Sequence, residues 1–173
     1  MENKTIFKGK IFTLEEKDVT IHNKKYKRDV IRHPGGVGIL LIQDHKVLLV
    51  KQMRHAIDKE TLEIPAGKLE YGEDPMQAGL RELNEEAGYE CKSLKPIVSF
   101  VSTPGFCDEV IWLYQADQPY PAQHKLAMDE DEDITKVWID LDQAYKMIKN
   151  NEIIDAKTII AIQYALLERS YKS

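Results

Sequence analysis

Three glutamates, Glu82, Glu85 and Glu86, stand close together in one short segment. On an α-helix, residues three and four positions apart share a face, so the three carboxylates can converge on one point. Like charges at this spacing destabilise a bare helix, and its C-terminal end disfavours anions. A hard cation among the carboxylates removes both penalties, and oxygen-only ligands favour Mg²⁺ or Mn²⁺ over zinc. The alternative is a solvated helix face that also carries Arg81, which could hold one of the glutamates in place.

The helix that must carry these side chains is predicted over residues 75–87. Asp74 is a favourable N-cap, Pro75 suits the first helical position, and Gly88 is a natural C-terminal stop. One face can pack into a core, because it carries Met76, Leu80, Leu83 and Ala87. The glutamates fall on a face rotated well away from it.

The rest of the chain alternates strands with two more helices. Residues 1–34 are predicted to form short strands with a hairpin turn at Asn23–Lys24, and a second turn is expected at Asp44–His45. Further strands are predicted at residues 37–42, 46–50, 97–101, 110–116 and 136–139, and helices at 141–149 and 156–171. Residues 61–69 are predicted to form a strand that turns into a loop. This order predicts an α+β domain with α/β/α layers.

Composition limits the function classes. A length of 173 residues, 43% of them hydrophobic, fits one globular domain. The net charge of -5 argues against a nucleic-acid-binding surface, and no stretch is apolar enough to suggest a signal peptide or a membrane span. Cys91 and Cys107 lack metal-site or disulfide-framework spacing, so both are expected to be reduced in the cytoplasm.

The segment from residue 67 to 89 resembles the signature of the Nudix hydrolases, G-x5-E-x7-R-E-U-x-E-E-x-G-U. Every fixed position is present, and only Tyr89 departs mildly from the final bulky apolar residue. The matching residues are Gly67, Glu73, Arg81, Glu82, Leu83, Glu85, Glu86 and Gly88. The resemblance implies the Nudix fold, a mixed β-sheet between α-helices, and hydrolysis of a nucleoside diphosphate linked to another group.

The resemblance also implies roles for individual residues. Glu82 and Glu86 would bind the metal, with Mg²⁺ expected and Mn²⁺ possible, and the Ala66 carbonyl would add a ligand. Glu85 would be a further ligand or the group that activates water, and Arg81 would support the catalytic cluster.

Features outside the signature are similar to the ADP-ribose pyrophosphatases. They include the loop STPGFCDE at residues 102–109 and the segments KQMRHA, EIPAGKLE and DAKTIIAIQYALL. This similarity implies that ADP-ribose is split into AMP and ribose 5-phosphate. The alternatives are another sugar nucleotide such as GDP-mannose, or a non-catalytic Nudix-like regulatory module, which an intact signature disfavours.

Several substrate-binding residues are expected around this centre. Arg54 is predicted to place its guanidinium on the diphosphate, since arginine suits that geometry. Glu63 could orient a water or bind a ribose hydroxyl, or be a surface carboxylate at a strand end. In the 102–109 loop, Phe106 could stack on a base or pack in the core, and Glu109 could touch the terminal ribose. Pro104 and Gly105 of the same loop are also predicted to bind substrate, by its similarity to the ADP-ribose pyrophosphatases.

The N-terminal segment, residues 1–34, is expected to dimerise, whereas residues 35–173 form the hydrolase domain. By analogy with the subfamily, Arg28 would contact adenine or phosphates, in its own site or in a partner's. The acidic run at residues 129–133 is either solvated or carries a catalytic base, with Glu130 preferred to Glu132. Either glutamate would compete with Glu85 for the role of general base.

Overall fold

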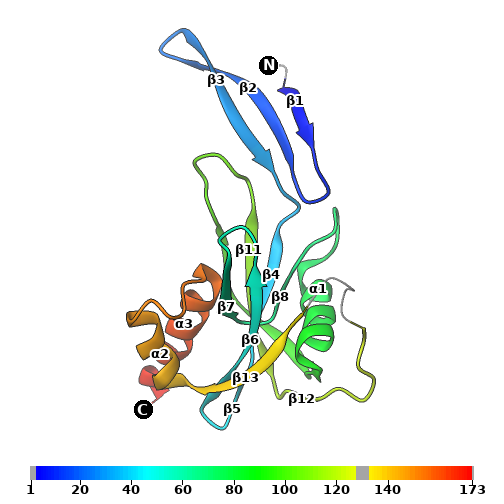
Figure 1. Ribbon diagram of the computed structural model, residues 1–173, viewed down its shortest axis with the longest axis vertical. Coiled ribbons are helices and arrows are strands. Elements are labelled where there is room, and N and C mark those ends of the chain that lie inside the picture. Colours follow the sequence, from blue (N-terminus) through cyan, green and yellow to red (C-terminus); the bar gives the residue numbers. More distant parts are fainter. Residues whose placement is uncertain (1–2, 128–132, 173) are drawn as a thin grey trace.

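The computed structural model of the protein describes residues 3–127 and 133–172. Its body contains two four-stranded sheets between helices (Figure 1). The first sheet has the order β10-β11-β4-β8, with bounds Ser93–Val101, Val110–Asp117, Gly36–Leu40 and Ala66–Lys68. The second sheet has the order β13-β6-β5, and β7 also pairs with β6. Its strands are β13 (Thr135–Asp140), β6 (Lys46–Arg54), β5 (Ile42–Gln43) and β7 (Lys59–Glu63). A two-stranded ribbon joins β9 (Tyr89–Glu90) to β12 (Tyr120–Pro121).

The helices cover the sheets from both sides. Helix α1 (Pro75–Glu82) packs against β4, β8 and β10. On the other side, α2 (Leu141–Lys149) packs against β6 and β13, and α3 (Ala156–Lys172) against β4, β7 and β11 (Figure 1). The first sheet is mixed because β11 and β4 run parallel, so the predicted α+β class with α/β/α layers is confirmed. Among the described residues, no helix combines the length and apolarity needed to cross a bilayer.

The apolar runs at residues 37–42 and 46–50 form the centre of the core because both faces of their strands are covered. Ile39 packs in the cluster beneath α1, whereas the next residue, Leu40, packs in the cluster beneath α2 and α3. Leu48 and Leu49 divide between the same two clusters. Successive side chains of a strand point to opposite faces, so a strand buried on both sides carries an unbroken apolar run.

The N-terminal residues form a separate antiparallel sheet that projects from the body (Figure 1). Its strands are β1 (Asn3–Lys8), β2 (Thr13–Ile21) and β3 (Lys24–Arg32). The turn between β2 and β3 lies at His22–Asn23, so its prediction at Asn23–Lys24 was wrong by one residue. Both turn residues have positive φ, 49° and 59°, as a two-residue hairpin turn requires. The predicted turn at Asp44–His45 is confirmed, also with positive φ.

The base of this sheet is tied to the loop at residues 102–109. Ile31 bridges to Cys107, and its amide donates to the Phe106 carbonyl at 2.7 Å. Arg32 forms ion pairs with Glu15 of β2 and with Asp108 of the loop, at 3.0 and 2.9 Å. The loop is therefore held between the N-terminal sheet and the body.

Candidate active site

Local sequence signals place the start of the acidic helix. The Asp74 carboxylate accepts hydrogen bonds from the amides of Met76 and Gln77, both at 3.0 Å, so Asp74 is the predicted N-cap. Pro75 occupies the first helical position, and Gly88 ends the segment in the left-handed region, with φ of 69°. Both ends of the predicted segment are confirmed.

The last turn of this segment differs from the prediction. Residues Leu83–Ala87 form a π-helix, η1, so the expectation of one regular α-helix over residues 75–87 was wrong there. A π turn spaces its hydrogen bonds five residues apart, which offsets the following side chains from their α-helical positions. This offset changes the directions of Glu85 and Glu86 relative to Glu82, and local propensity gives no signal for it.

Glu82 lies against the backbone of β8 at a position that only glycine can occupy. A Cβ atom built on Gly67 would lie 1.9 Å from Glu82 Oε1. Glu82 is 6% exposed and forms an ion pair with Arg81, whose Nη1 lies 2.7 Å from Glu82 Oε1. The missing side chain of Gly67 therefore makes the space for the Glu82 carboxylate, which explains a glycine at the start of the signature.

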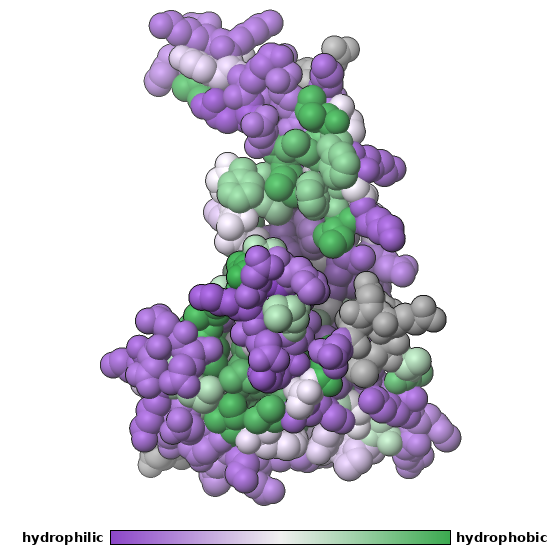
Figure 2. All heavy atoms as spheres, in the orientation of Figure 1, coloured by the Kyte–Doolittle hydropathy of each residue, from purple (hydrophilic) through white to green (hydrophobic). Residues whose placement is uncertain are grey.

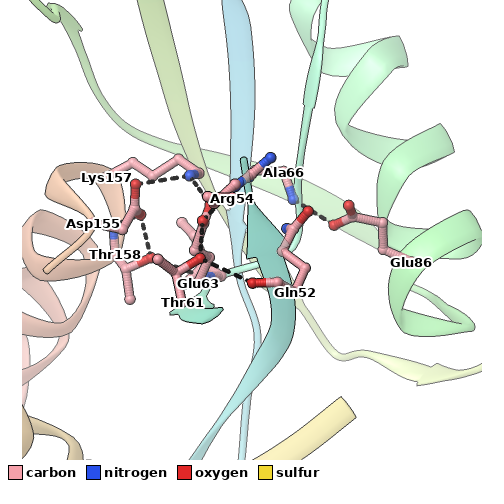
Figure 3. Close-up of polar contacts among 10 residues, drawn as sticks. Gln52, Arg54, Thr61, Glu63, Ala66, Glu86, Asp155, Lys157 and Thr158 are labelled. Carbon is pink, nitrogen blue, oxygen red and sulfur yellow. Dashed lines mark hydrogen bonds and ion pairs between the residues drawn. The ribbon is translucent and has the colours of Figure 1, made fainter. Parts of the chain in front are cut away.

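Glu86 is held against the first residue of β8. The Ala66 amide donates to Glu86 Oε2 at 2.8 Å, and Glu86 is 2% exposed (Figure 3). This hydrogen bond brings Glu86 next to residue 66, whose carbonyl was the expected additional ligand.

Arg81 joins the acidic residues of the signature. Its Nη1 lies 2.7 Å from Glu82 Oε1 and 2.8 Å from Glu85 Oε2, and its Nε lies 3.4 Å from Glu73 Oε1. Burial lowers the pKa of Arg81, but the charges of Glu82, Glu85 and Glu73 outweigh it and raise the pKa. Glu73 also accepts from the Glu70 amide at 2.9 Å, so it braces the loop before the helix. The predicted bracing role of Arg81 matches this geometry.

The donor set suits a hard divalent cation in its chemistry, because carboxylate and carbonyl oxygens supply it. The space that Gly67 leaves by having no side chain is filled by the Glu82 carboxylate, one of the expected metal ligands. Within residues 3–127 and 133–172, however, no three acidic, histidine or cysteine side chains are grouped closely enough to hold a metal ion. In this part of the chain, Glu82 and Glu85 both contact the Arg81 guanidinium, which lies between them.

These residues line a cleft of about 910 Å³. The predicted site residues that line it are Arg54, Ala66, Arg81, Glu82, Glu85, Glu86 and Glu109. It is also lined by residues that the sequence did not single out, including His33, Gln52, Lys68, Asp155 and Lys157. The cleft thus brings together β6, β8, α1, η1 and the start of α3.

Arg54 and Glu63 form a buried ion pair on the β6–β7 hairpin. Arg54 donates from Nε and Nη2 to the two oxygens of Glu63, at 2.7 and 2.6 Å (Figure 3). The Glu63 side chain is 3% exposed, so its interpretation as a surface carboxylate was wrong. Burial raises the pKa of Glu63, but Arg54, Lys157 and Thr61 outweigh it and hold the pKa at about 2. Both Glu63 oxygens therefore have protein partners, which leaves neither directed at a ribose hydroxyl.

The comparisons with known proteins agree with this site. The chain matches the family model of the NUDIX domain over residues 32–161. The chain belongs to the Nudix family. It is 41% identical to the methanol dehydrogenase activator of Bacillus methanolicus, over 99% of this chain and 94% of that protein. It is 40% identical to the ADP-ribose pyrophosphatase of Bacillus subtilis (strain 168), over 100% of this chain and 97% of that protein.

A solved structure supports the fold assignment. The crystal structure of an ADP compounds hydrolase superposes with a TM-score of 0.84 at 21% identity, covering 100% of this chain and 94% of that one. At this identity the likeness concerns the fold alone. The predicted Nudix fold is therefore confirmed.

Other predicted residues of this Nudix protein lie away from the cleft. Arg28 is exposed on β3, donates to the Lys27 carbonyl at 3.0 Å and lies 5.6 Å from the Tyr26 ring centre. It does not line the cleft of its own chain, and its action in a partner's site stays a prediction.

The 102–109 loop of the Nudix domain places its candidates differently. Phe106 is 54% exposed, so its interpretation as a core residue was wrong. Pro104, Gly105 and Phe106 are absent from the cleft lining, whereas Glu109 lines it and lies 3.3 Å from His33 Nδ1. The amide of Gly35 also lies 3.0 Å from His33 Nδ1.

Glu130 and Glu132 lie outside the described residues, so their roles stay predictions. The flanking segments are tied to the Nudix helix. Asn84 donates to the His124 carbonyl at 3.0 Å and accepts from the Leu126 amide at 2.8 Å. On the other flank, Lys136 donates to the Ala87 carbonyl at 3.0 Å.

Proposed function

We propose that the protein is a divalent-metal-dependent pyrophosphatase that hydrolyses ADP-ribose to AMP and ribose 5-phosphate. The observation that carries this proposal is the cleft itself, where the glutamates of an intact Nudix signature face cationic side chains from β6 and α3. A diphosphate needs positive charge on both of its phosphates, and the cationic side chains together with a divalent cation held by the glutamates would supply it. Relatives named ADP-ribose pyrophosphatase, one of which matches over the full chain, support the choice of substrate.

The residues that would hold the metal are Glu82, Glu86 and the Ala66 carbonyl, with Glu85 as an additional ligand or base. Mg²⁺ is the proposed ion, and Mn²⁺ should substitute. When bound, the metal would neutralise the diphosphate and acidify a water. Arg81 restrains Glu82 and Glu85 through hydrogen bonds, and Gly67 leaves the space that the Glu82 carboxylate fills.

Arg54 would contact the diphosphate with the part of its guanidinium that Glu63 does not use. Two of its five N–H groups bind Glu63, and the side chain is 40% exposed and lines the cleft. Glu109, which also lines the cleft, is the proposed contact for the terminal ribose. Glu130 or Glu132 remains the proposed alternative to Glu85 as general base.

We also propose that the N-terminal sheet pairs with a second copy of the chain. It presents exposed apolar side chains that a monomer leaves in water, and apolar groups gather on its lower half in Figure 2. The exposed apolar residues are Ile6 and Phe7 on β1, Ile11 in the turn before β2, and Ile21 and Tyr26 near the tip of the β2–β3 hairpin. Contiguous exposed apolar surface commonly marks an interface. Arg28 on the same sheet would then approach the partner's cleft.

The proposed compartment is the cytoplasm. Both cysteines, Cys91 and Cys107, carry free thiols, as the reducing cytoplasm maintains them.

The test of the proposed activity is a panel of sugar nucleotides with detection of the monophosphate products. ADP-ribose, GDP-mannose and ADP-glucose would each be incubated with Mg²⁺, with Mn²⁺ and with chelator. We expect the highest kcat/KM for ADP-ribose, no turnover in chelator, and no activity for Glu86→Gln with Mg²⁺. Full activity in Glu86→Gln, or equal activity in chelator, would refute the metal site.

A second candidate function comes from the relative named methanol dehydrogenase activator, which matches at 41% identity. An alcohol dehydrogenase would be assayed with and without this protein, using wild type and Glu86→Gln. Stimulation by the wild type alone would indicate that a partner is activated through the hydrolytic site. Stimulation by both proteins would indicate a role in binding that needs no catalysis.

A further inference from the structure

The start of α3 contributes a buried cation to the cleft that the signature does not predict. Lys157 is the second residue of α3, its side chain is 15% exposed, and it lines the cleft together with Arg54. Its ammonium group contacts Glu63 and also Asp155, the latter at 2.9 Å (Figure 3). Arg54 and Lys157 therefore share one buried carboxylate, although they come from opposite ends of the domain sequence.

Glu63 is built into the protein as the counter-ion of both cations. It accepts from Arg54, from Lys157 and from the Thr61 hydroxyl, the last at 2.6 Å. The Thr61 hydroxyl has a single proton, so the contact with the Gln52 carbonyl at 3.5 Å is secondary. Since Glu63 is almost fully buried, its charge faces the two cations rather than the cleft.

Asp155 pairs with Lys157 and is also held by Thr158. It accepts from the amide and the hydroxyl of Thr158, at 3.0 and 2.5 Å, at the N-terminus of α3, where negative charge is favourable. The Thr158 hydroxyl also accepts from the Ile64 amide at 2.9 Å, one residue after Glu63. These bonds fasten α3 to the end of β7 and set the position of Lys157.

The donor count leaves hydrogen-bonding capacity for a ligand. An ammonium group has three N–H donors, and the contacts with Glu63 and Asp155 use two of them. Arg54 retains three of its five donors. In Figure 3 Arg54 and Lys157, with their partners Glu63 and Asp155, lie on one side of Ala66, and Glu86 lies on the other. An anion between these two groups would thus meet the N–H donors of Arg54 and Lys157 that Glu63 and Asp155 leave unused.

We propose that Lys157 and Arg54 form one anion subsite, built on Glu63, that binds a phosphate of the substrate. Its assignment to the diphosphate of ADP-ribose rests on the proposed function. Lys157 is then a substrate-binding residue and Glu63 a positioning residue. Because both cations share Glu63, loss of Lys157 leaves that carboxylate to neutralise Arg54 more completely. The contributions of the two cations to anion binding should therefore be coupled.

The test measures binding of inorganic pyrophosphate in chelator by calorimetry, separately from activity. We expect Lys157→Met to weaken binding about tenfold or more, as loss of a charge-assisted bond to phosphate does. Lys157→Arg should restore most of the affinity. Lys51→Met is the matched control, because it also replaces a lysine by methionine. The ion pair of Lys51 with Glu60 lies at the surface of the β6–β7 hairpin, which also carries Arg54 and Glu63. The control should bind as the wild type does.

A double-mutant cycle tests the shared carboxylate. If Lys157 and Arg54 act together, Arg54→Gln and Lys157→Met combined should lose less affinity than the product of their separate losses. The subsite would be overturned if the double variant lost as much affinity as the product of the two separate losses. Unchanged pyrophosphate binding in Lys157→Met, or no pyrophosphate binding by the wild type, would overturn it as well. Lys157→Gln, which keeps a donor and removes the charge, replaces Lys157→Met if circular dichroism shows that the latter is unfolded.

These results are distinguishable from failure of the proposed function. A wild type that cleaves no sugar nucleotide, but whose pyrophosphate binding still depends on Lys157, would refute the activity and retain the subsite. If the wild type hydrolyses ADP-ribose and Lys157→Met binds pyrophosphate normally, the activity is retained and the subsite is refuted.

Discussion

Replacing Glu63 with glutamine should destabilise the protein strongly. The substitution keeps the size of the side chain and removes the negative charge that Arg54 and Lys157 share. The new amide has one acceptor oxygen and two N–H donors, so at least one cation would face a donor. Breaking a buried ion pair by removing one partner is costly because the remaining charge loses its counter-ion.

The pKa of Glu63 sets the magnitude. It is about 2 in the folded protein, compared with an ordinary value of 4.5. Since one pKa unit corresponds to about 1.4 kcal/mol, the folded environment favours the ionised form by about 3 kcal/mol. For a chain of this length, such a loss should lower Tm by about 6–12 °C.

The same linkage predicts the pH dependence. The pKa of Glu63 is lower in the folded than in the unfolded state, so its contribution to the free energy of unfolding is complete above about pH 4.5. It is lost as the pH falls from 4.5 toward 2. The difference in stability between wild type and Glu63→Gln should therefore be constant near neutral pH and shrink progressively below pH 4.5.

Urea unfolding followed by circular dichroism, at pH 7 and at steps down through the window from pH 4.5 toward 2, measures this difference. Glu60→Gln is the matched control, because Glu60 lies on the same strand, is 55% exposed and pairs with Lys51 at 2.6 Å. An exposed pair contributes about 0–1 kcal/mol, so the control should change little. Equal stability of Glu63→Gln and Glu60→Gln at pH 7 would refute the reasoning.

Three further predictions concern the site and the interface. Gly67→Ala should lower turnover about a hundredfold or more, because the new Cβ would displace the Glu82 carboxylate. Gly105→Ala is the control: a Cβ there meets no atom within 4 Å, so kcat should stay at the wild-type value. Equal rates in both variants would contradict the crowding argument. Phe7→Ser should shift the protein from dimer to monomer in light scattering after size exclusion, and a wild type that is already monomeric would exclude the proposed interface. Glu130→Gln should lower kcat far more than it weakens substrate binding in single-turnover and equilibrium measurements, and unchanged turnover would remove Glu130 from the mechanism.

Much of the fold and the acidic half of the site could be predicted because they depend on short-range rules. Asp74, Pro75 and Gly88 mark the ends of the helix within a few residues of the positions they affect. The apolar runs of β4 and β6 show that both faces of these strands are covered. Glu82 and Glu86 are also close in sequence, so the spacing predicted that they share a helix face, and the resemblance of residues 67–89 to the Nudix signature indicated the family.

The cationic half of the site was decided by tertiary structure. Lys157 and Glu63 are 94 residues apart, and they meet only because α3 docks against β7. Arg54 reaches Glu63 through the pairing of β6 with β7, which turned an expected surface carboxylate into a buried counter-ion. The π turn in η1 also escaped prediction. Local spacing determines caps, turns and helix faces, whereas contacts between distant segments depend on strand register and helix docking, which the whole core selects.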